Sequence, residues 1–392
     1  MRLHSGIATF LLGLAGLAQA QTGAPQLVQS IPAETDLADP ALPFAKDVWP
    51  QMIRAAKNRI DLAEFYATNA PGSALEPVLA ELEMAGRRGV KIRILLTSRM
   101  LGQDPATVLR LKAIPGAELR PFDFGEGVRG ILHAKYFLID GEEAFLGSQN
   151  FDWRALQHIH ETGLRFRNPE LIKPLTLIFE TDWEFARSKR TLFEPGLREP
   201  VEGPRPALEL VASPLAITPP SVRPALNALL EILKQAQERV RVQLLTYSPV
   251  SGKTRHWPLL DNALRAAAVR GVKVQLLVSD WNLDRPAVDH LKSLALVPNL
   301  EIRIASIPEA SSGHIPFARV IHSKYMTVDG GLLWLGTSNW SEDYFTESRN
   351  LELILRDRSL AAQGDRIFER LWNSRYASAL DPAKSYAPRK RD

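Results

Sequence analysis

Two ten-residue segments of the chain pair a histidine with a lysine in the same unusual way. They are ILHAKYFLID, residues 131–140, and VIHSKYMTVD, residues 320–329. The histidine and the lysine are two positions apart in both, as His133 with Lys135 and His322 with Lys324. Both segments are apolar enough to predict strands, and residues two apart on a strand share a face. Such a potentially charged pair is costly in an apolar strand, so we expect these four residues to serve a functional site.

These residue types suit chemistry at a phosphate ester. A histidine acts as a nucleophile or proton carrier near neutral pH. Two histidines on either side of one phosphorus could attack it and protonate the leaving oxygen. Two lysines could stabilise the negative charge that builds on the non-bridging oxygens. Because each segment holds one histidine and one lysine, we expect the segments to meet at a single site. A matched pair of this kind disfavours the alternative that the histidines are ordinary core residues.

The pattern continues identically after both segments. Each histidine is followed seven positions later by an aspartate, Asp140 or Asp329, and then by glycine. Asp-Gly between two apolar strands predicts a tight hairpin. Seven is an odd number, so a straight strand directs the aspartate away from the histidine face, and we assign both aspartates a structural role.

Small and amide-bearing residues follow each hairpin, in the sequences GSQN and GTSN. The glycines, Gly147 and Gly336, predict a close approach of the backbone to a neighbour. The asparagines Asn150 and Asn339 each come seventeen positions after their histidine, and we expect them to hold phosphate oxygens. The hydroxyl groups in the same tetrapeptides are predicted to help bind the substrate. They belong to Ser148, Thr337 and Ser338.

The repeat extends beyond these motifs. RRGVKIRILL resembles VRGVKVQLLV, RIDLAEFYA resembles RVRVQLLTY, and IFETDW matches IFERLW at the same offset of 189 positions as the two histidines. A shared offset over two anchors indicates internal duplication. Strands alternate with helices in each half, which predicts an α/β fold with a mixed or parallel sheet. We expect two α/β/α sandwich halves, packed as a pseudo-twofold duplicate around one active site.

Length and composition fit two ordinary domains in an exported protein. The chain has 392 residues, 45% of them hydrophobic and 23% charged, with a net charge of +4. It contains no cysteine, which excludes disulfides, thiol nucleophiles and Cys-ligated zinc. Residues 1–20 resemble a cleaved signal peptide, so we expect a periplasmic or secreted protein. The predicted boundaries are an N-terminal half at 21–193, a proline-rich joint at 194–224 and a C-terminal half at 225–392.

The duplicated motif, His-x-Lys, four residues, Asp, six residues, Gly-Ser/Thr and then Asn, resembles the phospholipase D superfamily. The segments SIPAETD, GSQNFDWRALQHIHETG, HIPFARVIHSKYM and GTSNWSEDYFTES resemble the lysosomal phospholipase D-like 5′-exonucleases of animals and their poxvirus relatives. The resemblance covers nearly all the chain after the signal peptide. The chain departs from these proteins in having no cysteine and an apparently cleaved N-terminus, which puts the compartment and substrate-shaping loops in doubt.

The resemblance implies a covalent phosphohistidine and no required metal or other cofactor. Superfamily precedent favours His133 as the nucleophile and His322 as the acid. The superfamily also places an acidic residue about 25–32 positions after each histidine to orient a catalytic histidine. Here Glu161 and Glu347 fall at 28 and 25 positions. His158 and His160 beside Glu161 raise the alternative of a metal site, but the sequence shows no further ligand cluster nearby.

The resemblance implies a phosphodiesterase that acts on single-stranded nucleic acid from the 5′ end. A phospholipase D or phosphatidyl transferase that acts on phospholipid headgroups remains the alternative, because the same motifs serve both. A phosphate-binding module without catalysis is disfavoured by two complete motifs. Aromatic residues that follow the motifs are candidates for base stacking or for the core; they are Trp153, Trp340, Tyr344 and Phe345.

Overall fold

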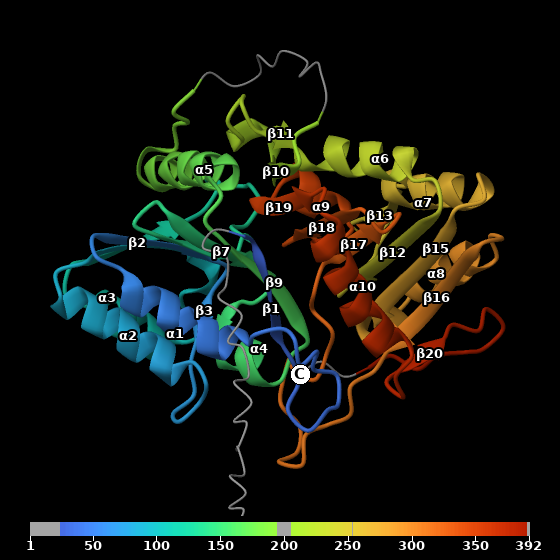
Figure 1. The fold of residues 1–392 in the computed structure, drawn as a ribbon, viewed down its shortest axis with the longest axis horizontal. Helices are drawn as coiled ribbons and strands as arrows, with labels where there is room; N and C mark the ends of the chain where they lie inside the picture. The colour runs from blue at the N-terminus through green and yellow to red at the C-terminus, as the bar shows by residue number, and fades with distance from the viewer. Residues whose placement is uncertain (1–23, 194–204, 253, 390–392) are drawn as a thin grey trace, which may run out of the picture.

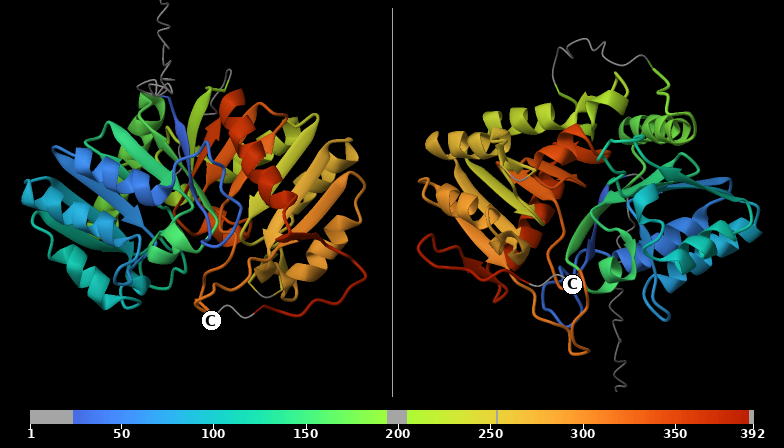
Figure 2. Two further views of the ribbon diagram at one scale, coloured as in Figure 1. Left: turned by 60° about the horizontal axis from the view of Figure 1, so that its bottom comes forward. Right: turned by 180° about the vertical axis from the view of Figure 1, so that it is seen from behind.

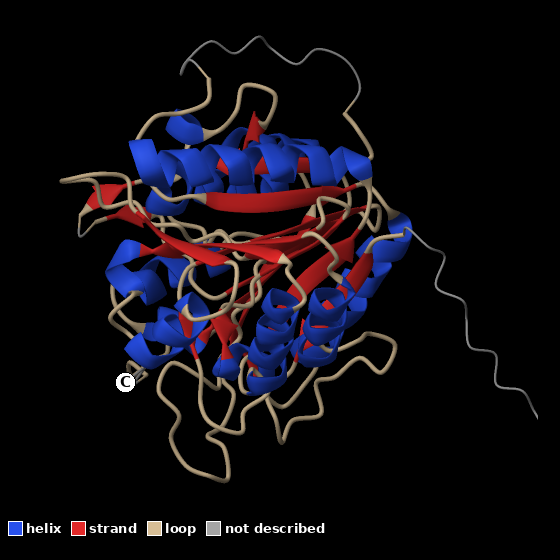
Figure 3. Ribbon diagram, turned by 90° about the vertical axis from the view of Figure 1, so that its left-hand side faces the viewer, coloured by secondary structure: helices blue, strands red, loops and turns tan. Residues whose placement is uncertain are grey.

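The computed structural model describes residues 24–193, 205–252 and 254–389. The predicted signal peptide at 1–20 and residues 194–204 of the predicted joint lie outside the described residues. Two large mixed β-sheets lie against each other across a shared interior, with helices on their outer faces (Figure 1; Figure 2). Viewed from the side, strands run through the middle of the molecule and helices cover them on opposite sides (Figure 3).

The first sheet has the strand order β1-β9-β7-β6-β2-β4-β5. Strands β2, β4 and β5 are parallel, and the remaining neighbours pair antiparallel. The strands are β1 (Gln26–Ser30), β2 (Arg59–Glu64), β4 (Lys91–Thr97), β5 (Ala117–Phe122), β6 (Tyr136–Ile139), β7 (Glu143–Gly147) and β9 (Glu161–Phe166). The helices of this half are α1 (Ala45–Ala55), α2 (Glu76–Arg87), α3 (Pro105–Lys112), α4 (Trp153–Gln157) and α5 (Pro169–Ser188).

The second sheet has the strand order β11-β10-β19-β18-β17-β12-β15-β16-β20. Its strands are β10 (Leu208–Ser213), β11 (Arg223–Pro224), β12 (Arg239–Leu244), β15 (Lys273–Ser279), β16 (Leu300–Ala305), β17 (Tyr325–Val328), β18 (Leu332–Gly336), β19 (Asn350–Leu355) and β20 (Ala377–Ala379). Its helices are α6 (Ala225–Gln235), α7 (Leu259–Val269), α8 (Ala287–Ala295), α9 (Glu342–Thr346) and α10 (Arg358–Trp372). The central seven strands repeat the first sheet's order, which confirms the predicted duplicated α/β fold.

Short strands complete the two halves. β3 (Ala67–Thr68) pairs with β8 (Phe151–Asp152), and β13 (Val250–Ser251) pairs with β14 (Arg255–His256). Strand β10 lies within the predicted joint at 194–224, yet it pairs antiparallel with β19 just as β1 pairs with β9. Residues 208–213 of the joint therefore belong to the second sheet.

Three layers of apolar packing hold the sheets and helices together. Helices α1, α2 and α3 pack on the outer face of the first sheet, and α6, α7 and α8 pack on the outer face of the second. The central layer contains the inner faces of both sheets together with α5 and α10. Burial of apolar surface is the dominant favourable term in folding, so this continuous central layer fixes one half against the other.

The helices of the central layer begin with capping residues that the sequence displays. Asn168 precedes α5, and its side chain accepts a hydrogen bond from the backbone N–H of Glu170 at 2.7 Å. Pro169 then occupies the first helical position, where no N–H is needed. Asp357 caps α10 by accepting from the N–H groups of Ser359 and Leu360.

The Asp-Gly pairs form the predicted hairpins. Asp140 and Gly141 both have positive φ, 54° and 70°, between strands β6 and β7. Asp329 and Gly330 have φ of 51° and 62° between β17 and β18. Two successive residues with positive φ are what a type I′ turn requires, and aspartate and glycine are the residues that adopt this conformation most readily.

The histidines and lysines themselves lie just before the strands, not within them. Strand β6 begins at Tyr136 and β17 at Tyr325, so the prediction that each His-x-Lys lies inside a strand is wrong. The physical reason is that these segments take their backbone partners from the opposite half of the molecule, as described below.

Candidate active site

The two histidine segments are joined to opposite halves by reciprocal backbone hydrogen bonds. The N–H of His133 donates to the carbonyl of Arg349 at 2.9 Å, and the N–H of His322 donates to the carbonyl of His160 at 2.8 Å. The return bonds run from Arg349 to Ile131 at 2.8 Å and from His160 to Val320 at 3.0 Å. Each residue of one exchange stands 189 positions from its counterpart in the other. The pseudo-twofold axis that relates the halves therefore passes between the two motifs.

His133 is oriented by an amide from the second half. Its Nδ1 lies 2.9 Å from Oδ1 of Asn350. The Asn350 amide nitrogen donates to the carbonyl of Tyr344 at 2.9 Å, and Thr337 Oγ1 donates to Oδ1 at 2.9 Å. These contacts turn the amide oxygen toward the imidazole. Nδ1 of His133 must then carry the proton, which leaves a lone pair on Nε2.

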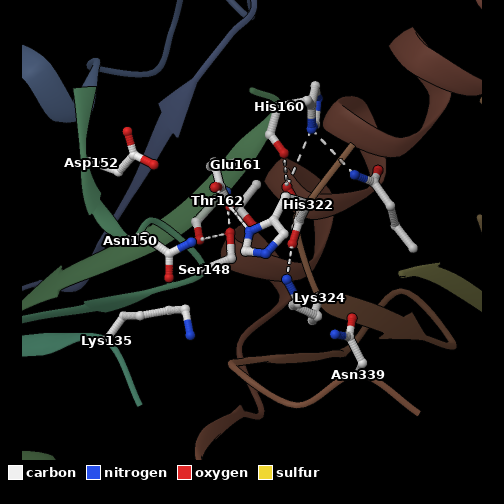
Figure 4. A network of polar contacts seen from close by, with 12 residues as sticks. Lys135, Ser148, Asn150, Asp152, His160, Glu161, Thr162, His322, Lys324 and Asn339 are labelled. Atoms are coloured by element: carbon white, nitrogen blue, oxygen red, sulfur yellow. Dashed lines mark hydrogen bonds and ion pairs between the residues drawn. The ribbon is translucent and has the colours of Figure 1, made fainter. Parts of the chain in front are cut away.

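His322 is oriented by a carboxylate from the first half. Both oxygens of Glu161 lie 2.9 Å from Nδ1 of His322. Glu161 is completely buried at the start of β9. Figure 4 shows this contact at the centre of the site. The carboxylate fixes the tautomer of His322 and favours its protonated form.

The two lysines are fully buried beside their histidines. Lys135 Nζ donates to the carbonyl of His133, and Lys324 Nζ donates to the carbonyl of His322. Both side chains have zero exposure. In Figure 4, Lys135 and Asn150 from the first half and Lys324 and Asn339 from the second lie on opposite sides of the same space.

The charges of both motifs act on one another, which places them in one site. Burial lowers the pKa of His133 well below its usual value, and Lys135 and Lys324 lower it further. Burial also lowers the pKa of His322, again with help from both lysines. The pKa of each histidine is thus lowered by the lysine of the other half as well as by its own.

The remaining ionisable groups of the site are also perturbed. Burial raises the pKa of Glu161 to about 8, although Lys324 opposes the shift. Burial lowers the pKa of Lys135 to about 7, opposed by Glu64 and Glu161. Burial also lowers the pKa of Lys324 well below its usual value. Burial disfavours the charged form of either partner, and Glu161 and His322 share one contact, so the carboxyl and the imidazole titrate as a pair.

The two motif asparagines border the same site. Asn150 donates to the Tyr66 hydroxyl at 3.4 Å, and Asn339 Oδ1 accepts from the backbone N–H of Thr246 at 3.3 Å. Asn150 retains 6% exposure and Asn339 retains 1%. Both lie beside the lysines of the site, and their predicted contact with phosphate oxygens stays a prediction (Figure 4).

The hydroxyl groups predicted to bind substrate are occupied inside the protein. Ser148 accepts from the N–H of Thr162 at 3.1 Å, and Thr337 donates to Asn350. Ser338 donates to the buried carboxylate of Glu352. All three residues have zero exposure. In this structure the three hydroxyls contact neighbouring protein groups, and their predicted part in substrate binding stays a prediction.

Glu347 does not make the expected contact with a histidine. It is exposed at the end of α9, and Asn350 contacts His133 in its place. Asn350 lies only three positions after Glu347, but its side chain faces the interior because the chain enters β19 at Asn350. The offset of 189 would have found the right residue, since it carries Glu161 onto position 350.

The matching geometry of the two hairpins gives the aspartates and glycines structural positions. Asp140 accepts from the N–H groups of residues 57–59 at 2.7–2.9 Å, and Asp329 does the same for residues 237–239 at 2.8–2.9 Å. A Cβ added to Gly147 would lie 2.7 Å from the Cα of Gly163, and one added to Gly336 would lie 2.9 Å from the carbonyl of Leu351. Strands β9 and β19 can approach only because these residues have no side chain.

His158 and His160 pack against polar and aromatic neighbours. His160 is buried, and its Nδ1 lies 3.2 Å from both Ser323 Oγ and Gln243 Nε2. Burial lowers its pKa to about 4. The His158 ring packs edge-on against Trp153. Within residues 24–193, 205–252 and 254–389, no group of three or more histidines, cysteines or carboxylates is arranged to hold a metal ion.

The sequence model of a family described as "Cardiolipin synthase, PLD-like domain" matches the chain twice, over residues 50–183 and 229–372. The two matches contain the two histidine motifs and span most of the chain. The chain belongs to the PLD-like family. The superfamily resemblance drawn from the motifs is thereby confirmed.

Several curated proteins are similar to the PLD-like chain over almost its whole length. It is 31% identical to the 5′-3′ exonuclease PLD4 of Mus musculus, covering 94% of this chain and 82% of that protein. It is 32% identical to the 5′-3′ exonuclease PLD3 of Bos taurus, with 91% and 81% covered. It is also 32% identical to Phospholipase D Z of Dictyostelium discoideum, with 93% of each chain covered.

A solved structure shares the PLD-like fold. Phosphatidylserine synthase of Haemophilus influenzae Rd KW20 aligns with a TM-score of 0.63 at 14% identity, covering 86% of this chain and 85% of that one. At this identity the likeness concerns the fold alone.

Sequence reasoning missed several buried groups of the PLD-like site. Glu64, at the end of β2, is buried near Lys135, and burial raises its pKa well above the usual value. Tyr66 donates to Asp152 at 2.7 Å, and Asp152 in turn holds Arg154 at 2.8 Å. None of these residues repeats between the halves, so the duplicated pattern gave no signal for them.

Among the described residues, no helix combines the length and apolar character needed to cross a membrane.

Proposed function

We propose that the chain is a phosphodiesterase that acts through a covalent phosphohistidine, as a 5′-exonuclease on single-stranded nucleic acid. The observation that carries the chemistry is the unequal partnering of two histidines within one site, with Asn350 on His133 and Glu161 on His322. The substrate class and direction are supported by the printed names of relatives that match more than nine-tenths of the chain.

His133 acts as the nucleophile in this proposal. An amide partner and nearby lysines disfavour its protonated form, so Nε2 keeps its lone pair at neutral pH. Nε2 attacks the phosphorus, and a P–N bond forms as the bond from phosphorus to the leaving oxygen breaks. Precedent in the superfamily pointed to the same histidine, and the amide contact adds a physical reason.

His322 acts as the acid and then as the base. Glu161 favours the imidazolium form, so His322 can donate the Nε2 proton to the leaving oxygen in the first step. In the second step the neutral Nε2 takes a proton from water as the water oxygen attacks phosphorus. The P–N bond breaks, and His133 returns to its starting state.

Lys135 and Lys324, with Asn150 and Asn339, stabilise the negative charge on the non-bridging oxygens. Donors held in a buried site need no reorganisation as charge develops. A bound phosphate would favour the charged form of both lysines, which burial alone disfavours. The proposal therefore requires no metal and no organic cofactor.

A phospholipid substrate is the second candidate. One relative over 93% of the chain is named Phospholipase D Z, and the family description refers to cardiolipin synthase. The same two-histidine chemistry would serve a lipid phosphodiester.

We also propose that residues 1–20 direct export and are removed, which places the enzyme in the periplasm or outside the cell.

The deciding experiment offers purified protein two substrates in parallel. End-labelled single-stranded DNA is expected to shorten from its 5′ end, and phosphatidylcholine vesicles are expected to stay intact. His133→Ala is the matched inactive control for a contaminating nuclease. EDTA is expected to leave the rate unchanged. Loss of activity in EDTA that is restored by one added metal would contradict the metal-free mechanism. Release of choline with intact DNA would overturn the nuclease assignment in favour of the lipid one.

A further inference from the structure

One aromatic ring stands out on the surface of the second half. Phe317 is 48% exposed, and it is the only aromatic among the large exposed hydrophobic residues in the part of the chain that the structure describes. Its backbone has a φ of +58°, and Arg319 two positions later has +54°. Bulky residues rarely adopt positive φ, and such conformations persist only where the surroundings hold them.

The loop around Phe317 is held firmly from below. Trp281, which follows strand β15, meets the Phe317 ring edge-on at 6.5 Å and 79°. Ala318 and Val320 pack on Ile159 and Leu245 in a small buried cluster that Trp281 joins. Arg319 is buried and donates to the carbonyls of Pro308 and Ala33, each at 2.6 Å. The ring is therefore presented to solvent on a built support.

The same support leads into the candidate active site. Arg154 donates to the carbonyl of Pro316 at 3.0 Å, and it also binds Asp152, which accepts from Tyr66 beside Asn150. The loop connects β16 to β17 at the sheet edge where β12 and β15 also end, and where His322 lies. His322 comes five positions after Phe317, so their Cα atoms lie within about 18 Å of each other.

We infer that Phe317, supported by Trp281, is a stacking platform for a nucleobase of the single-stranded substrate. The inference rests on the proposed nuclease function and names a subsite for it. A flat exposed ring over a rigid base suits one base face, and stacking on aromatic rings is tolerant of sequence. The neighbours Ser311, Ser312 and His314 are exposed and polar, so the ring does not belong to the broad apolar patch that marks a membrane contact.

The aromatic residues that follow the motifs are not exposed in the way that Phe317 is. Trp340 and Phe345 are 1% and 5% exposed and belong to the core behind the second sheet. Tyr344 packs edge-on against the His133 ring at 4.9 Å. Stacking by Trp340 or Phe345 is thus ruled out by burial, and Phe317 is the ring available to a base farther along the strand.

The first test compares Phe317→Ala, Phe317→Leu and Phe317→Trp on single-stranded DNA. Loss of the ring in the alanine and leucine variants should raise KM about five- to 150-fold, whereas the tryptophan variant should stay within about threefold of the parent. Hydrolysis of a small p-nitrophenyl phosphodiester should not change in any of them, because it does not reach the platform. Leu109→Ala, which removes another exposed apolar side chain, 65% exposed on α3, is the control.

A second test places the base itself. DNA strands with one abasic nucleotide at successive positions from the 5′ end should reveal one position at which the loss raises KM for the parent but not for Phe317→Ala. Equal KM values for the parent and Phe317→Leu at every position would overturn the platform. Reduced binding of Phe317→Ala to phospholipid vesicles, with unchanged DNA kinetics, would overturn it in favour of a membrane contact. Failure of the parent to cleave any DNA would instead contradict the proposed function.

Discussion

The two halves of the site share a scaffold and differ in the group that orients each histidine. The backbone exchange between the halves is the same on both sides, and each lysine donates to the carbonyl of its own histidine. The orienting residue is Glu161 on one side and Asn350 on the other, at equivalent positions of the repeat. Duplication supplied two copies of one half-site, and a single carboxylate-to-amide difference gives the two histidines different hydrogen-bond partners.

A second difference concerns stability rather than chemistry. The residue preceding Asn350 is Arg349, which is fully buried and bonded to Asp182 on α5 of the first half at 2.7–3.0 Å. Its counterpart in the first half is His160, which contacts Ser323 and Gln243 without an ion pair. The halves are therefore clamped unequally on the two sides of the pseudo-twofold axis.

The largest expected effects come from removing each histidine. His133→Ala and His322→Ala should each lose at least about a hundredfold on natural diesters. They should differ on a p-nitrophenyl diester, whose leaving group departs without a proton. His322→Ala should keep an initial burst of p-nitrophenol and accumulate phosphoenzyme, and His133→Ala should show no burst in stopped-flow absorbance. A phosphohistidine on His322 in the His133→Ala variant would reverse the assignment.

Breaking the buried clamp should cost the most stability. Arg349→Met leaves the Asp182 carboxylate buried without its cation, so the free energy of unfolding in urea should fall by about 3–5 kcal/mol. Arg187→Met removes an exposed partner of Glu184 and should cost less than about 1 kcal/mol. A loss for Arg349→Met no larger than for Arg187→Met would show that the two halves do not depend on this clamp.

Exchanging the orienting groups should move the two limbs of the pH–rate profile separately. Glu161 has its pKa raised to about 8, so its pair with His322 keeps the acid proton below that pH, and kcat/KM should fall as pH rises through about 8. In Glu161→Gln both lysines still disfavour the imidazolium, so this alkaline limb should move to lower pH. In Asn350→Asp a carboxylate favours protonated His133, so the acid limb should move up by about one unit or more. Limbs that stay in place would contradict the roles given to these two residues.

The smallest expected effects are at the two hairpin aspartates, where the halves are alike. Asp140→Asn and Asp329→Asn each weaken three backbone hydrogen bonds at the partly exposed start of a strand. Each should lower the free energy of unfolding by about 1–2 kcal/mol, with kcat on a small diester little changed. A loss of activity without a loss of stability in either variant would show that the aspartate acts in catalysis.

The sequence by itself determined the duplication, the order of the elements and the four residues at the centre of the site. The histidines and lysines could be found because they recur at one offset in apolar segments, where a charged group needs a reason. The Asp-Gly hairpins followed for a local reason, since few residues adopt two successive positive φ values. These features depend on neighbours in the chain, and a single sequence records such neighbours.

Only the tertiary structure decided which residue orients which histidine. Glu161 follows His133 in the chain but contacts His322, and Asn350 follows His322 but contacts His133. The crossing arises because β9 and β19 begin where their segments pair with the opposite half. The full burial of hydroxyls such as Ser148 was likewise not evident from the sequence, because burial is set by packing between the sheets. Contacts across the interface of the halves depend on how two distant segments meet, and spacing along the chain carries no record of that.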